Sequence, residues 1–309
     1  MSTVIDRAAA RASGFIPQVW AQKALDVLRA NIVLLSMIAR DVDFVPVAQG
    51  ETLNIPYPGT FTARKKTEGA PATTQAPVGG ATVPVTLSEF AYVDFIVPDF
   101  TRVQASSELL DRYVTPAAIA IAEQVETDLF SVFPTFTGGT VDATTGGVNE
   151  AAIMAAAELL DAAKCPQTDR ALVLATRDKY RVLSDPALKQ YFAFNRPQAV
   201  QKGEIGEAYN FRTLSSQLVP RVGVAPDPVV NKNIAIHKSA MIIALRGLPE
   251  PEPGSGVDAQ TIVDEDSGLA IRVMRAYDVA ERGHRITLDV LYGYRRLRPE
   301  LGVVIESHQ

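Results

Sequence analysis

The sequence predicts an α+β fold, because extended strands and amphipathic helices are both indicated along the chain. Residues 52–57 and 82–97 alternate apolar and polar side chains with the period of two that strands require. Residues 115–133 instead carry apolar side chains at three- and four-residue steps, which is typical of an amphipathic helix. Short apolar runs in the last third of the chain predict the strands of a mixed sheet.

The composition indicates a globular protein. The 309 residues are 47% hydrophobic and 21% charged, which is enough apolar surface to build a substantial core. The net charge of -5 argues against tight, nonspecific binding of nucleic acid, which needs a cationic surface. The single cysteine, Cys165, excludes an intrachain disulfide and is interpreted as a small buried side chain.

The N-terminal region predicts neither export nor a membrane span. Arg7 and Arg11 interrupt the first alanines, so the apolar core of a secretory signal is missing. The most apolar window, 27–39, contains Arg29 and is shorter than the roughly 20 residues of a membrane helix. Residues 16–39 have a roughly helical apolar spacing, and this stripe must lie against either the body of its own chain or a neighbouring chain.

The two alternating segments flank a stretch rich in Thr, Ala, Pro and Gly at 60–80. This pattern predicts a long two-stranded hairpin whose tip carries Arg64, Lys65 and Lys66, with Glu68 as the only nearby acid. An isolated hairpin is at best marginally stable in water, so a projection of this length needs a surface to lie on. The alternative is an ordinary flexible surface loop.

A long helix follows the hairpin. Ser106 or Ser107 is expected to cap a short helix, and Thr115 with Pro116 supplies a second cap and a first-turn proline. The long helix then continues to Pro134, where the missing N–H of proline ends it.

The middle of the chain predicts a helix and then a strand followed by another helix. The first helix begins after Asn149 as its cap and ends before Pro166. Residues 171–175 are expected to form a strand, with Thr176 as the cap of the next helix and Pro186 at its end. Further strands are expected within 235–245, 269–277 and 285–294, separated by turn-rich segments at 249–256 and 281–283.

Candidate catalytic and metal-binding residues are sparse. His237, His284 and His308 stand at no ligand spacing from one another or from Cys165, so no metal site and no cofactor are expected. His237 and Ser239 could suggest a base and a nucleophile, but residues two apart in a strand merely share a face. The sequence therefore predicts no catalytic residue.

Three other polar segments also favour structural roles. The acidic run 264–266 lacks the alternating ligands of a calcium loop and is interpreted as a solvated turn. Gly203, Gly206 and the Gly-Ser-Gly segment at 254–256 lack the context of a phosphate-binding loop. The arginines at 295–298 have no interleaved aromatic residues, so a salt-bridged structural cluster is favoured over nucleic-acid contact.

Several segments, and their order along the chain, resemble the major capsid (coat) proteins of tailed bacteriophages. The similarity is to the podovirus and siphovirus branch. In the C-terminal third it is carried by LAIRVMRAYD at 269–278, ITLDVLYGY at 286–294 and RPELGVV at 298–304. Further similar segments are LVLATRDKY at 172–180 and GEIGEAYNF at 203–211. Some members of this branch carry an extra inserted domain, for which the stretch 219–235 is too short.

The resemblance implies the domains of the tailed-phage major capsid fold. They are an N-terminal arm at 1–45, an extended E-loop hairpin at 46–97, a peripheral domain at 98–145 and 265–309, and an axial domain with a mixed sheet at 146–264. The helix at 115–133 would be the spine of the peripheral domain.

The function implied by the resemblance is structural and not enzymatic. Copies of the chain would assemble as pentamers and hexamers into an icosahedral shell around phage double-stranded DNA, in the cytoplasm of the host bacterium. Scaffolding, portal and decoration proteins would be the partners, without a membrane, and Arg64, Lys65 and Lys66 are the expected intersubunit contact. The alternatives are another shell-forming protein of the same fold and an α/β enzyme or ligand-binding protein.

Overall fold

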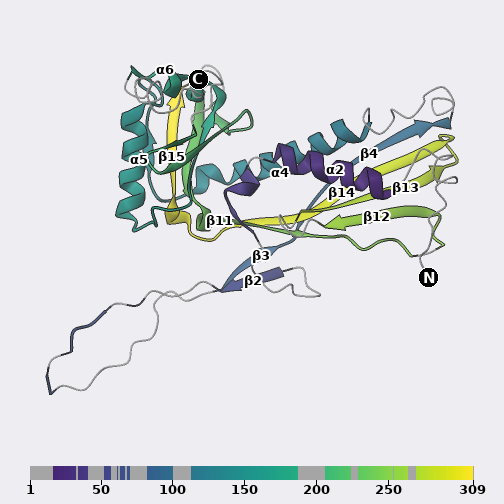
Figure 1. The fold of residues 1–309 in the computed structure, drawn as a ribbon, viewed down its shortest axis with the longest axis horizontal. Coiled ribbons are helices and arrows are strands. Elements are labelled where there is room, and N and C mark those ends of the chain that lie inside the picture. The colour runs from purple at the N-terminus through teal and green to yellow at the C-terminus, as the bar shows by residue number, and fades with distance from the viewer. Residues whose placement is uncertain are drawn as a thin grey trace.

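The computed structural model describes residues 17–32, 34–40, 52–56, 61, 63–66, 68–69, 82–99, 113–186, 206–223, 229–252, 254–263 and 269–308. Within these residues the chain forms a long sheet, a compact sheet and a two-stranded hairpin that projects from the body (Figure 1). Helices pack against both larger sheets, which confirms the predicted α+β class.

The long sheet is built around one strand of 14 residues, β14. This strand pairs antiparallel with β4, β11 and β13, because its length allows different partners along it. Helices α2 and α4 contact each other and the same sheet. The described strands of this sheet are β1 (Ala39–Arg40), β4 (Glu89–Pro98), β11 (Met241–Arg246), β12 (Val257–Val263), β13 (Ala270–Asp278) and β14 (Gly283–Arg296).

Helix α4 (Thr115–Ser131) confirms the long helix predicted from its apolar spacing. Its buried stripe includes Ile121, Val125 and Leu129, which face the sheet and helix α2. Thr115 is not a capping residue, because the backbone of Val114 is already helical and no side-chain cap forms. The helix ends before Pro134, and the short 3-10 helix η4 (Phe133–Thr135) continues the turn.

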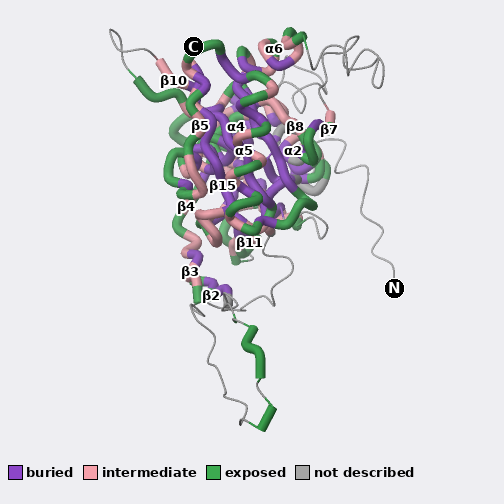
Figure 2. Tube along the Cα trace, turned by 90° about the vertical axis from the view of Figure 1, so that its left-hand side faces the viewer, coloured by how far each residue is buried: buried purple, intermediate pink, exposed green. Residues whose placement is uncertain are grey.

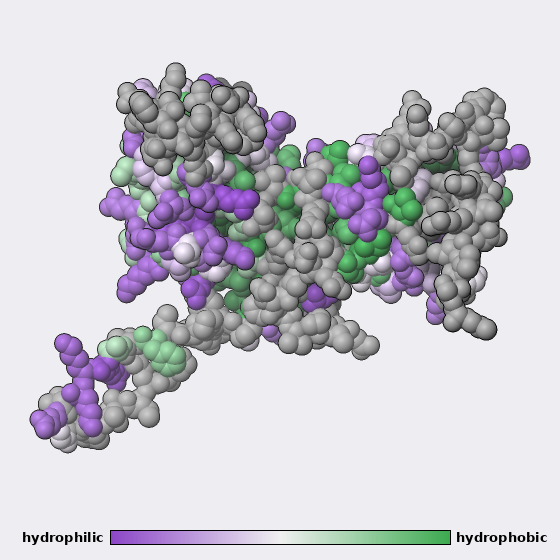
Figure 3. All heavy atoms as spheres, viewed as in Figure 1, coloured by the Kyte–Doolittle hydropathy of each residue, from purple (hydrophilic) through white to green (hydrophobic). Residues whose placement is uncertain are grey.

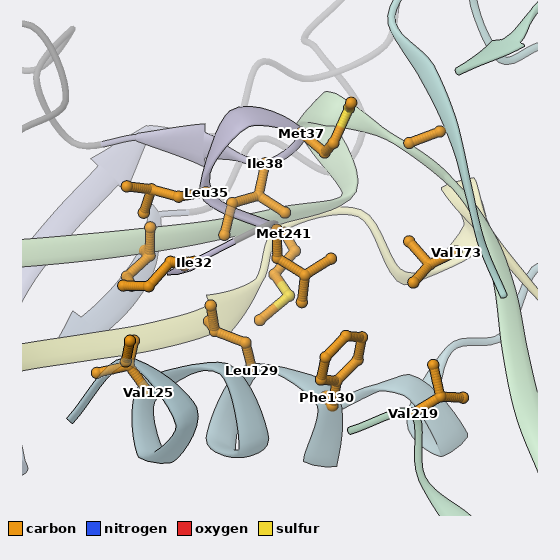
Figure 4. Close-up of a cluster of buried hydrophobic side chains, with 14 of the residues drawn as sticks. Ile32, Leu35, Met37, Ile38, Val125, Leu129, Phe130, Val173, Val219 and Met241 are labelled. Carbon is orange, nitrogen blue, oxygen red and sulfur yellow. The ribbon is translucent and has the colours of Figure 1, made fainter. Parts of the chain in front are cut away.

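The described part of the N-terminal arm lies on the body of its own chain. Helix α2 (Pro17–Asn31) buries Trp20, Ala24 and Leu28 against α4, β12 and β13. It is shorter than the predicted helix, because the chain passes into η1 (Leu34–Ser36) and then into β1, which pairs parallel with β11. Figure 4 shows side chains of this segment packed between α4 and β11.

The compact sheet carries helices α5 (Glu150–Ala162) and α6 (Thr176–Ser184). Asn149 caps α5 as predicted, because its side chain accepts the N–H of Ala152 at 3.0 Å. Thr176 is the first residue of α6 and makes no cap, so that prediction is wrong. The described strands are β5 (Thr140–Asp142), β6 (Arg170–Ala175), β7 (Glu207–Ala208), β8 (Phe211–Ser216), β9 (Arg221–Val222), β10 (Val230–His237) and β15 (Gly302–His308).

Two chain segments cross from one larger sheet to the other. Strand β10 leads through η5 (Lys238–Ala240) to β11, and β14 leads through η6 (Pro299–Leu301) to β15. The run at 235–245, predicted as one strand, is therefore two strands in different sheets. The sheets also cut across the expected domain boundaries, because β15 belongs to the compact sheet whereas β11 and β12 belong to the long sheet.

The two larger sheets share one continuous hydrophobic core. Phe130 of α4, Val173 of β6 and Met241 of β11 lie in the same cluster of buried side chains (Figure 4). Figure 2 shows buried residues running through the body of the molecule, whereas the far end of the hairpin is exposed. The body therefore behaves as one packed unit from which the hairpin projects.

The hairpin is formed by β2 (Thr52–Pro56) and β3 (Thr82–Thr86), which pair antiparallel as predicted. The alternating run at 82–97 is divided at Leu87 and Ser88, so that its second part is β4 of the long sheet. The proposed short helix at Ser106 or Ser107, the acidic run 264–266 and Gly203 lie outside the described residues.

Candidate assembly surfaces

Arg64, Lys65 and Lys66 lie on the projection and are exposed. Figures 1 and 2 show the described stretch 63–66 far from both larger sheets, and Figure 3 shows hydrophilic side chains at this end. Glu68, the acid of the same stretch, is exposed as well. The structure therefore places this basic triplet where a second molecule can reach it.

The base of the hairpin is clamped to the long sheet by a small apolar cluster of its own. Leu53, Ile55 and Val85 from the hairpin pack against Ile242 and Ala244 of β11. Strand β11 can serve two cores because alternate side chains point to opposite faces, and its other residues join the main core. The stem is thereby fixed to the body, although the tip lies away from it.

The arginines near the C-terminus contribute to the same junction. Arg295 donates from its guanidinium to the carbonyl oxygen of Pro84 in β3 at 3.0 Å. Arg296 donates to the carbonyl oxygen of Thr135, just after helix α4. These contacts are structural, as expected, but the acceptors are main-chain carbonyl groups and not the acidic side chains of the predicted salt-bridged cluster.

A surface groove of about 390 Å³ lies between β4 and α4, next to β14. Glu89 and Tyr92 of β4, Gln124 and Asp128 of α4, and Tyr292 of β14 are among the residues that line it. The Tyr292 hydroxyl donates to Asp128, which also accepts the Gln124 amide at 3.1 Å. Burial, the bond to Asp128 and the charges of Asp128 and Glu89 raise the pKa of Tyr292.

A fully buried carboxylate, Asp178, organises one side of the compact unit. It accepts hydrogen bonds from Asn231 at 3.2 Å, Asn233 at 2.9 Å and Ser307 at 2.6 Å. Arg181 stands 3.4 Å from it. These contacts tie helix α6 to β10 and β15, which is a structural role that sequence reasoning missed. The alternation of Asn231 and Asn233 in a largely buried strand was the available signal.

His237 and Ser239 do come into contact, but as a cap and not as a catalytic pair. The His237 Nδ1 atom accepts the main-chain N–H of Ser239 at 3.1 Å and lies 2.8 Å from its Oγ. Because this nitrogen caps the 3-10 helix η5, its lone pair is committed to a backbone donor. Burial lowers the pKa of His237, although Asp169 opposes the effect.

The described residues contain no group of three or more His, Cys, Asp or Glu side chains that could hold a metal ion. Cys165 is buried as expected, and burial raises the pKa of its thiol. Among the described helices, none has the length and hydrophobicity to cross a membrane. The features that stand out on this part of the molecule are therefore surfaces, namely the basic tip and the acidic groove.

No protein-family model matches the sequence, and a search of curated proteins finds no match. The fold, in contrast, matches solved structures. A structure of Mycobacterium phage Che8 is 19% identical, with a TM-score of 0.60 over 89% of this chain and 90% of that chain. The capsid of Ralstonia phage GP4 is 12% identical, with a TM-score of 0.60 over 88% and 87%.

A virus-like particle from Pyrococcus furiosus is 12% identical, with a TM-score of 0.52 over 93% of this chain and 98% of that chain. At these identities the likeness concerns the fold. The fold expected from the sequence resemblance is thus confirmed over nearly the whole chain: it is the fold of solved tailed-phage capsid subunits.

Proposed function

We infer that the chain is a major capsid protein, which self-assembles as pentamers and hexamers into an icosahedral shell around phage double-stranded DNA. The observation that carries this proposal is the match of fold to a phage capsid over 88% of this chain. The exposed tip of the hairpin supports it, because a projection of this kind gains stability when it lies on a partner.

The two larger sheets suggest how a subunit is arranged in such a shell. The long sheet with α2 and α4 is the proposed peripheral domain, and the compact sheet with α5 and α6 is the proposed axial domain. These assignments modify the expected boundaries of the peripheral domain, 98–145 with 265–309, and of the axial domain, 146–264. Strand β11 joins the peripheral domain because it belongs to the long sheet, and β15 joins the axial domain because it belongs to the compact sheet. The continuous core would let the subunit act as one rigid unit during assembly.

The basic tip is the proposed intersubunit contact. An exposed ion pair contributes only about 0 to 1 kcal/mol. In a closed shell, however, each subunit is held by several contacts at once, so weak contacts sum to stable assembly. Arg64, Lys65 and Lys66 are exposed and far from their own body, which suits this role.

The shell function involves no reaction, so the proposal assigns the chain no enzymatic activity and no cofactor. Scaffolding, portal and decoration proteins are the partners proposed for assembly in the host cytoplasm. The net charge of -5 suits a container that does not trap its DNA by nonspecific binding.

A second candidate is a shell-forming protein of the same fold that encloses something other than a phage genome. It is favoured by the match to a virus-like particle over 98% of that chain. The two candidates differ in what the shell encloses. Only a phage capsid should contain nuclease-resistant double-stranded DNA in particles formed in infected or lysogenic cells.

Negative-stain electron microscopy of the purified chain tests the shell function directly. The protein should form rings, closed shells or polymorphic shell fragments, alone or with a scaffolding partner, because the described tip of its hairpin lies away from its own body. A subunit that stays monomeric at high concentration under both conditions would overturn the proposal.

A further inference from the structure

The groove between β4 and α4 opens beside the unpaired edge of β4. Within the described part of the chain, β4 pairs with β14 on one side and with no strand on the other. Residues from both faces of β4 line the groove, including Glu89 and Tyr92, so it wraps around this edge. An edge strand also presents unpaired main-chain carbonyl groups, which can accept hydrogen bonds from a partner.

The groove is negatively charged. Helix α4 contains three acidic residues and no basic residue, and it places Asp128 beside the groove. Glu89 lies on the opposite wall, where it accepts a hydrogen bond from the Ser88 hydroxyl at 3.1 Å. Neither carboxylate forms an ion pair within the described residues. Each can therefore accept further donors, since an ionised carboxylate has about four acceptor sites.

Aromatic rings complete the rim of the groove. The side chains of Phe90 and Tyr92 are 48% and 63% exposed, and their ring centroids lie 6.0 Å apart. Rings of this kind attract cations to their faces, with the greatest effect where water is excluded. Two carboxylates and two exposed rings in one groove therefore favour a ligand with ammonium or guanidinium groups on flexible apolar stems.

The chain itself carries such a ligand on its projection. Lys65 and Lys66 are exposed, and neither forms an ion pair within the described residues. Both views of the fold place the tip away from the body, so it does not occupy the groove of its own subunit (Figures 1 and 2). A tip on one subunit and a groove on the next make a head-to-tail contact, which forms a ring when the rotation between neighbours closes.

We propose that Lys65 and Lys66 of one subunit bind in the groove of a neighbouring subunit, between its Glu89 and Asp128 and against its Tyr92. This contact rests on the proposed shell function and gives the basic tip a defined acceptor. It uses charge complementarity to set which subunit face meets the tip, because like charges at the same place would repel.

A charge exchange between the two surfaces tests the contact. The tip variant is Lys65→Glu with Lys66→Glu, and the groove variant is Glu89→Lys with Gln124→Lys, which leaves Asp128 and Tyr292 in place. Each variant should raise the concentration needed for assembly by about tenfold or more, because attraction is replaced by repulsion in every copy. The chain carrying all four changes should assemble within about threefold of the parent, because the charges are again complementary.

The matched control places the same residue changes on another exposed surface. Glu158→Lys with Gln167→Lys alters two exposed positions of the compact unit that lie outside the groove. When these two changes are added to the tip variant, they should not restore its assembly. Circular dichroism of the unassembled subunits should show that all variants keep the parental thermal transition.

Zero-length carbodiimide cross-linking of parental shells provides a direct readout. Mass spectrometry should find Lys65 or Lys66 joined to Glu89 or Asp128 of another subunit. Suppose that the parent forms shells, but the chain with all four changes does not assemble and mass spectrometry finds other cross-links without this one. The proposed contact is then wrong, while the shell function stands. If the parent never oligomerises, the shell function fails and this contact fails with it.

Discussion

Gly293 of β14 is the position at which the base of the hairpin is most tightly constrained. A Cβ atom at this residue would lie 2.1 Å from the carbonyl oxygen of Thr86, 2.9 Å from the carbonyl carbon of Thr86 and 3.1 Å from Leu87 Cα. All three atoms are main-chain atoms at the end of β3 and the start of the connection to β4. No side-chain rotation can therefore relieve the clash.

The change Gly293→Ala should loosen this connection. A carbon and an oxygen approach without strain to about 3.3 Å, so the connection must move by roughly 1.2 Å. Forcing a methyl group into packed structure costs about 1 to 3 kcal/mol. Because the same connection positions Val85 against Ile242, the hairpin stem should lose its hold on β11 and assembly should weaken.

Urea unfolding of the unassembled subunit measures the cost, and hydrogen exchange locates it. The midpoint should fall, and the amides of β2 and β3 should lose protection before those of β6 and β10 do. Gly247→Ala is the control, because the three atoms nearest to its Cβ would be side-chain atoms: the methyl groups of Val263 and Thr261 at 3.1 and 3.3 Å and Ala270 Cβ at 3.8 Å. The clamp would be refuted by a Gly293→Ala subunit with the parental midpoint and a fully protected stem.

Two further predictions concern buried polar groups. Asp178→Ala leaves the donors of Asn231, Asn233 and Ser307 without their acceptor, so urea unfolding should show a loss of about 2 to 5 kcal/mol, and parental stability would contradict the network. Tyr292→Phe removes the bond to the Asp128 carboxylate and should cost about 1.5 to 3 kcal/mol at neutral pH. Because the pKa of Tyr292 is raised in the folded state, the unfolded chain releases this proton first as the pH rises. The contribution of Tyr292 to the parent's free energy of unfolding should therefore be fully present below about pH 10 and decrease above it. Between about pH 8 and 11, the urea midpoint of the Tyr292→Phe variant should fall less than the midpoint of the parent. If the two midpoints fall in parallel, this hydroxyl makes no contribution.

The sequence was sufficient for features that depend on near neighbours along the chain. Helix α4 follows from its apolar spacing and its flanking prolines, and the cap of α5 follows from Asn149. The hairpin strands β2 and β3 follow from alternation around a turn-rich stretch, and the resemblance of longer segments indicated the fold. The helix and the cap are encoded within about 20 residues, where periodicity and capping act.

Tertiary structure decided which sheet each strand joins. A period of two shows that a segment is extended but carries no information about its partner, so the runs at 82–97 and 235–245 each read as one strand although each divides between two sheets. It also decided that α2 lies on its own subunit, because an apolar stripe fits either surface.

The acidic groove likewise exists only in the folded chain. Glu89, Asp128 and Tyr292 come from three elements far apart in the sequence, and they meet because β4 pairs with β14 beneath α4. The basic tip could be read from adjacent residues, whereas its proposed acceptor could not. The physical reason is that adjacent charges follow directly from the order of residues, whereas a groove depends on long-range strand pairing and helix packing.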